Sequence, residues 1–145
     1  MNFQEKWRKL LLPLRYGGSG VNFKKLDPAR SPFLQDRDRI IYSSSFRRLA
    51  RKTQVHPLVR NDHIHTRLSH SLEVSSVGRS LGAMAGYFLR RRDELPEYAA
   101  PEFPGQILEA ACLAHDIGNP PFGHAGEFAI RDWFGDPANH TYCLL

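Results

Sequence analysis

The sequence has little cysteine and no long apolar run. It contains two cysteines, Cys112 and Cys143, in 145 residues, which are too few for the disulfide framework of a small secreted protein. No stretch is long and apolar enough to span a membrane, and the first residues lack the apolar centre of a signal peptide. We therefore expect a cytoplasmic protein that does not bind membranes.

Internal repeats, low-complexity tracts and a phosphate-binding P-loop are absent as well. The glycine-rich segment 17–20 is not followed by the Gly-Lys-Ser/Thr that a P-loop requires. With 41% hydrophobic and 24% charged residues, the composition is that of an ordinary globular domain long enough to bury a core.

Charge is divided unevenly along the chain. Residues 1–60 hold 14 Lys and Arg against 4 Asp and Glu, whereas residues 61–145 hold 6 against 11. A cationic half beside a half rich in His, Asp and Glu is typical of a protein that brings an anionic ligand to a metal. The alternative is a basic face that only keeps the protein soluble. Each arginine between Arg37 and Arg51 is accordingly either part of a phosphate clamp or a solvated surface residue.

The spacing of apolar residues predicts an all-α fold. Helices are expected over residues 3–12, 33–52, 66–92, 106–116 and 124–134. Ser31 and Pro32 suit the cap and first residue of the second helix, which the serines at 43–45 divide. The one exception is a small β-hairpin, predicted near residues 53–66 from alternating apolar residues.

The third and longest of these helices is predicted to bury one apolar stripe. Its members recur at steps of four and three: His70, Val74, Val77, Leu81 and Met84. A histidine at the head of such a stripe is either a hydrogen-bonded core residue or a ligand. Packing against an antiparallel helix that ends in His115-Asp116 would bring His70 to that pair.

The segment around residues 110–127 has the side chains for metal chemistry. His115 and Asp116 are adjacent at a predicted helix end, and an imidazole nitrogen with a carboxylate oxygen suits a divalent metal. After a Gly and two prolines, His124 and Glu127 lie three residues apart on one helix face, where the carboxylate can orient the imidazole. Arg67 could reach an anion held by the metal, and Gln54, with a donor and an acceptor, suits a sugar or a base.

Four ordered blocks resemble the deoxyguanosine triphosphate triphosphohydrolases, a family of HD-domain metal-dependent phosphohydrolases. The blocks are Arg47-Arg48-Leu49, Lys52-Thr53-Gln54-Val55, the run from Thr66 to Val74, and the run from His115 to Glu127. Together they span most of the chain between residues 30 and 134.

The resemblance implies an HD-domain helical bundle that hydrolyses dGTP or another dNTP to the deoxynucleoside and triphosphate. It implies Mg²⁺ or Mn²⁺ as cofactor, bound by His70, His115 and Asp116. It also implies proton transfer by His124, oriented by Glu127, and substrate contacts from Gln54, Arg67 and Asn119.

The family pattern has a fourth metal ligand, an aspartate on a later helix, which has no counterpart here. We therefore expect these residues to be an N-terminal part of a longer family fold, with a basic helical segment and hairpin over 1–65 and the HD domain over 66–145. Two alternatives remain open: an HD phosphodiesterase with another substrate, and a non-catalytic fragment that binds nucleotide, single-stranded nucleic acid or a partner. Exposed apolar surface on such a chain would favour a homo-oligomer.

Overall fold

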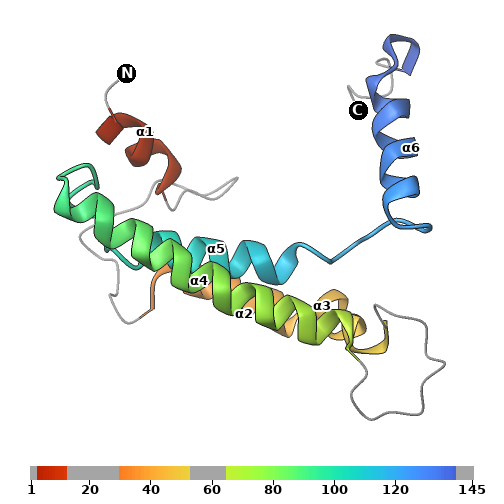
Figure 1. The fold of residues 1–145 in the computed structure, drawn as a ribbon, viewed down its shortest axis with the longest axis horizontal. Helices are drawn as coiled ribbons and strands as arrows, with labels where there is room; N and C mark the ends of the chain where they lie inside the picture. Colours follow the sequence, from red (N-terminus) through yellow and green to blue (C-terminus); the bar gives the residue numbers. More distant parts are fainter. Residues whose placement is uncertain (1–2, 13–29, 53–64, 140–145) are drawn as a thin grey trace.

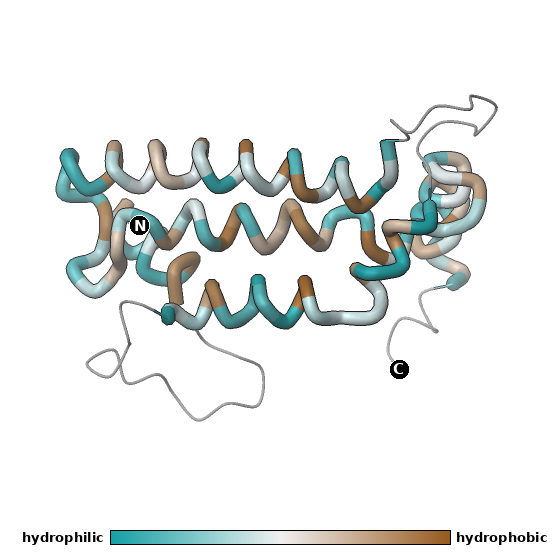
Figure 2. The backbone as a smooth tube through the Cα atoms, turned by 90° about the horizontal axis from the view of Figure 1, so that it is seen from below, coloured by the Kyte–Doolittle hydropathy of each residue, from teal (hydrophilic) through white to brown (hydrophobic). Residues whose placement is uncertain are grey.

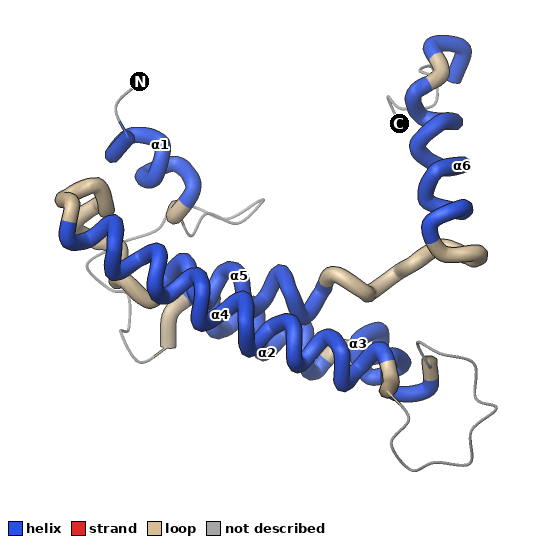
Figure 3. The backbone as a smooth tube through the Cα atoms, in the orientation of Figure 1, coloured by secondary structure: helices blue, strands red, loops and turns tan. Residues whose placement is uncertain are grey.

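The computed structural model describes residues 3–12, 30–52 and 65–139, and this part of the chain is helical without a strand (Figure 3). Its elements, shown in Figure 1, are α1 (Phe3–Leu10), α2 (Pro32–Tyr42), α3 (Ser44–Arg48), the 3₁₀ helix η2 (Leu49–Arg51), α4 (Arg67–Arg91), α5 (Phe103–Ala114) and α6 (His124–Gly135). The all-α prediction is confirmed for these residues. The predicted hairpin falls almost wholly on residues 53–64, and these, with Gln54 among them, lie outside the described residues.

Local capping signals explain where two of these helices begin. The Ser31 hydroxyl accepts a hydrogen bond from the Leu34 backbone N–H, and Pro32 opens α2 as predicted. Ser43 ends α2 and caps α3 by accepting from the Phe46 N–H, so the predicted break at the serines is confirmed.

Three helices lie side by side in a layer (Figure 2), with α5 packed against both α4 and α2. The chain turns back after α4, so α4 and α5 are antiparallel (Figure 1). A partly buried ion pair supports the α2–α5 contact, because Arg37 Nε donates to Glu109 Oε1 at 2.8 Å and Glu109 is only 6% exposed. The start of α4 and the end of α5 therefore meet at the same end of the bundle.

A cluster of apolar side chains holds that end together. Phe46, Leu49 and Leu113 are buried in it, and Leu68 and Ile117 pack against it. These residues come from α3, η2, α4, α5 and the segment after α5. The cluster therefore fixes the first turn of α4 relative to the end of α5.

The stripe that α4 buries differs from the one predicted. Val77, Leu81 and Met84 are 59%, 58% and 69% exposed, so their predicted burial is wrong. The buried residues of α4 are mainly small ones: Ser71, Ser75, Gly82, Gly86 and Leu89. The reason is that small residues let the backbones of α4 and α5 approach more closely than branched side chains would allow.

This close approach predicts a large effect for Gly86→Ala. A Cβ at Gly86 would overlap the carbonyl oxygen of Pro101, and overpacking of this kind should lower the free energy of unfolding by about 3 kcal/mol or more. Urea unfolding followed by circular dichroism measures the change. Gly135→Ala is the matched control, because beyond its own helical turn no atom of the described residues lies within 4 Å of its Cβ position, and it should shift stability by less than about 0.5 kcal/mol. Equal unfolding midpoints for the two variants would contradict the prediction.

Helix α6 stands away from the layer. It follows the connecting residues 115–123 and projects from the bundle (Figures 1 and 3). None of its residues is buried, and its large apolar side chains are about half exposed, namely Phe128, Ile130, Trp133 and Phe134.

Candidate metal centre

His70, His115 and Asp116 converge at the end of the bundle where α4 begins and α5 ends. One ligand atom from each lies within 4.8 Å of the other two, and the two imidazole rings are 5.2 Å apart between centroids. The antiparallel packing of α4 and α5 produces this meeting of residues 45 positions apart. Two ring nitrogens and a carboxylate oxygen form a donor set suited to a divalent cation.

A capping box sets the position of His70 in the first turn of α4. The Ser69 N–H donates to Thr66 Oγ1 at 3.2 Å, and the Thr66 N–H donates to Ser69 Oγ at 3.1 Å. These two bonds satisfy backbone donors that a helix start leaves unpaired. The sequence reading placed the helix start here but missed the box, for which the Thr-x-x-Ser spacing is the available signal.

The His115 ring is held in one tautomer by its own helix. Its Nδ1 lies 2.6 Å from the carbonyl oxygen of Cys112. Because a carbonyl oxygen only accepts, Nδ1 carries the proton and Nε2 is left with the lone pair. Such a backbone partner is the usual support of a metal-binding histidine.

The Asp116 carboxylate is the most buried member of the cluster, with 8% of the residue exposed. Its Oδ1 accepts from Arg67 Nη1 at 2.9 Å and from Asn119 Nδ2 at 2.6 Å. Its Oδ2 is buried and has no hydrogen-bond partner within the described part of the chain. Burying an unpaired acceptor is costly, so a cation bound at Oδ2 would satisfy it. The residues present therefore fit a metal ion.

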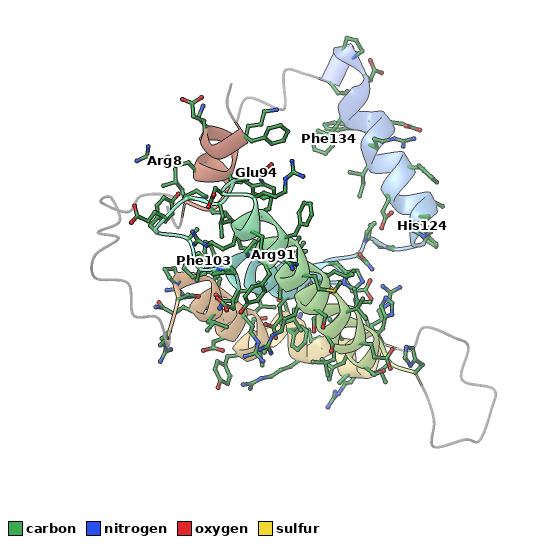
Figure 4. All side chains as sticks on the ribbon, turned by 60° about the vertical axis from the view of Figure 1, so that its left-hand side comes forward. Arg8, Arg91, Glu94, Phe103, His124 and Phe134 are labelled. Atoms are coloured by element: carbon green, nitrogen blue, oxygen red, sulfur yellow. The ribbon has the colours of Figure 1, made fainter. Side chains whose placement is uncertain are left out.

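The other predicted site residues divide into two groups. Arg67 and Asn119 lie at the metal cluster, where both donate to Asp116. His124 and Glu127 contact each other, with His124 Nδ1 3.0 Å from Glu127 Oε2, but they lie on α6. The His124 side chain is 90% exposed, at the start of α6 and away from the side chains that fill the bundle (Figure 4).

A pocket of about 180 Å³ opens next to the backbone that follows Asp116. It is lined by Ser45, Arg48, Leu49, Lys52, Ile117 and Gly118. Arg48 and Lys52 supply positive charge from the basic half of the chain, residues 1–60. Ile117 and Gly118 directly follow Asp116 in the sequence. An anion in this pocket would therefore lie beside the backbone segment that follows Asp116.

Two residues near the cluster were missed as functional candidates. His65 and Glu73 form a second His/His/carboxylate group with His70, and its ligand atoms also lie within 4.8 Å of one another. The available signal was spacing: Glu73 follows His70 by three residues on one helix face, and His65 precedes the helix cap.

The fold and this cluster define an HD-domain protein. The HD domain family model matches residues 67–144, more than half of the chain, and the chain belongs to this family. Among the described residues, no helix has the length and apolarity needed to cross a membrane.

Curated relatives give a closer comparison. The chain is 58% identical over 136 residues to a deoxyguanosinetriphosphate triphosphohydrolase-like protein of Pseudomonas aeruginosa (strain LESB58), covering 94% of this chain and 30% of the relative. It is 54% identical to a protein of the same description from Synechocystis sp., covering 89% and 29%. It is 47% identical to the deoxyguanosinetriphosphate triphosphohydrolase of Salmonella typhimurium, covering 78% and 25%. The chain thus spans less than a third of the length of these relatives.

Proposed function

We propose that this chain carries the metal- and phosphate-binding part of a dNTP triphosphohydrolase, which releases intact triphosphate from dGTP or a related dNTP. The observation that carries the proposal is the convergence of His70, His115 and Asp116 around a buried, unpaired carboxylate oxygen. The names of the relatives supply the substrate class.

The three cluster residues would hold Mg²⁺ or Mn²⁺. When bound, such an ion withdraws charge from a phosphate and lowers the pKa of its water. Arg67 keeps Asp116 in place through Nη1, and its other guanidinium donors can support negative charge on phosphate oxygens. Arg48 and Lys52, at the pocket beside Asp116, supply further positive charge for the triphosphate.

His124 is assigned the proton transfer at the departing 5′ oxygen. Glu127 orients the His124 ring through Nδ1, so that Nε2 faces away from Glu127 and is available to the substrate. This role requires α6 to approach the metal centre when substrate binds. Gly118 and Gly123 lie on either side of Pro120-Pro121 and hold positive φ angles of 81° and 56°. The wide range of backbone angles open to glycine gives the connection the freedom that such an approach needs.

The two remaining predicted contacts concern the nucleoside. Gln54 is assigned to the deoxyribose, where a close fit would exclude a 2′-hydroxyl. Asn119, which lies at the metal cluster, is assigned to the nucleotide.

Product analysis tests the proposal. The purified chain, incubated with dGTP and Mn²⁺, should release deoxyguanosine and triphosphate in equal amounts, measured by ion-exchange chromatography. Deoxyguanosine monophosphate with pyrophosphate would instead show cleavage at another phosphate and refute the proposal. Nucleic-acid binding that weakens steeply with salt and persists after metal removal, without dGTP turnover, would support the non-catalytic alternative.

A further inference from the structure

We propose a second cation site beside the metal centre, formed by His65, His70 and Glu73, which takes Zn²⁺ or a similar borderline divalent ion. The three residues offer two imidazole nitrogens and one carboxylate oxygen, a donor set found at zinc sites. Neither His65 nor Glu73 takes part in the proposed dGTP hydrolysis, so the site goes beyond that function.

The distance between the His65 and Glu73 donor atoms matches a zinc ion. His65 Nε2 lies 3.4 Å from Glu73 Oε2. Two ligand atoms of a tetrahedral zinc lie about 3.3 Å apart, because Zn–N and Zn–O bonds are about 2.0–2.1 Å long. A ligand atom of His70 lies within 4.8 Å of one ligand atom from each of the other two residues, so all three side chains can turn toward one ion.

The local backbone brings the three side chains together. His70 and Glu73 are one turn apart on α4, so they share a face. The capping box at Thr66 bends the chain into the helix and places His65 over that face, with the rings of His65 and His70 6.1 Å apart. The His65 and Glu73 side chains are 44% and 65% exposed, so an ion here is open to solvent and can complete its coordination with water.

Sharing His70 makes the two sites exclude each other. A neutral imidazole has one nitrogen with a free lone pair, so His70 binds one ion at a time. Zn²⁺ at the second site therefore removes a ligand from the His70/His115/Asp116 centre and should inhibit turnover supported by Mn²⁺. This last consequence rests on the proposed function, whereas the site itself does not.

Cobalt binding tests the site without an activity assay. In the full chain carrying His115→Asn and Asp116→Asn, only the second group is intact, and Co²⁺ should still bind with the visible absorption of a nitrogen-and-oxygen site. Adding His65→Asn or Glu73→Gln should weaken this binding at least about tenfold, since loss of even an outer partner of a metal ligand costs that much. Glu97→Gln, the same change at an exposed loop residue beyond α4, should leave it unchanged. Absence of Co²⁺ binding in the folded double variant, or equal binding with Glu73→Gln and Glu97→Gln, would overturn the proposal.

An NMR measurement on the unmodified chain keeps the test valid if the double variant does not fold. Zn²⁺ should shift the ring resonances of His65, identified by their loss in His65→Asn, because His65 is no part of the first centre. An unchanged His65 ring at saturating Zn²⁺ would refute the site. If Co²⁺ binding depends on Glu73 but the unmodified chain does not hydrolyse dGTP, the second site is supported and the proposed function is refuted. If the unmodified chain hydrolyses dGTP but Co²⁺ binding does not depend on Glu73, the proposed function is supported and the second site is refuted.

Discussion

Asp116→Asn is expected to lower the affinity for Mn²⁺ at least about a hundredfold. Loss of outer-shell partners alone costs 10- to 100-fold, and this substitution removes the only charged ligand of the cluster. Turnover of dGTP should fall about a thousandfold, because metal stabilisation of the reacting phosphate contributes several kcal/mol. Free Mn²⁺ measured by electron paramagnetic resonance and deoxyguanosine measured by chromatography give the two values.

The fold should survive this substitution. Asparagine retains an oxygen that can accept from Arg67 and Asn119 as Asp116 Oδ1 does. Asp132→Asn is the matched control, since the Asp132 side chain is 72% exposed on α6. If both variants bound Mn²⁺ with equal affinity, Asp116 would be excluded as a ligand.

His124→Ala is expected to reduce turnover by about 10²- to 10⁴-fold, the usual contribution of a positioned acid or base. Its affinity for Mn²⁺ should be unchanged, because His124 is exposed on α6 and belongs to neither candidate metal group. Glu127→Gln should have a smaller effect of the same kind, since it weakens the orientation of the ring and leaves the ring in place. Initial rates and Mn²⁺ binding, measured on the same preparations, separate catalysis from assembly of the centre.

Two results would count against this role. An unchanged rate in His124→Ala would remove the residue from proton transfer. A parallel loss of Mn²⁺ binding and turnover would indicate a structural contribution instead. Asp116→Asn is therefore expected to lower both metal binding and turnover, whereas His124→Ala is expected to lower turnover only.

Features that depend on neighbouring residues were predictable. The Ser31-Pro32 start of α2 and the break at Ser43 follow from capping chemistry that acts within a few residues. The end of α4 at Arg91 and the start of α6 at His124 also agree with the sequence reading. Helix α5 begins at Phe103, three residues before the predicted residue 106, because a proline such as Pro104 is tolerated in the first turn of a helix.

The metal cluster was predictable for a different reason. Its members are far apart in sequence, but His70 opens one helix and His115-Asp116 closes the next. In the structure the 12-residue α5 begins partway along the 25-residue α4, with Gly105 beside Gly82, and runs back to the start of α4, so these ends meet. Position along each helix indicated which side chains could become neighbours, and the offset of α5 along α4 brought the three residues together.

The sequence by itself determined most helix boundaries, the serine caps of α2 and α3, and which side chains stand at the helix ends that form the candidate metal group, since each depends on local backbone chemistry. Only the tertiary structure decided which face of α4 is buried. The apolar period pointed to Val77, Leu81 and Met84, but glycines at 78, 82 and 86 allow α5 to approach on another face, and their backbone contacts depend on a partner helix. The pairing of Arg67 with Asp116 was likewise decided by packing, because it joins α4 to the segment after α5 across a distance that residue order does not contain.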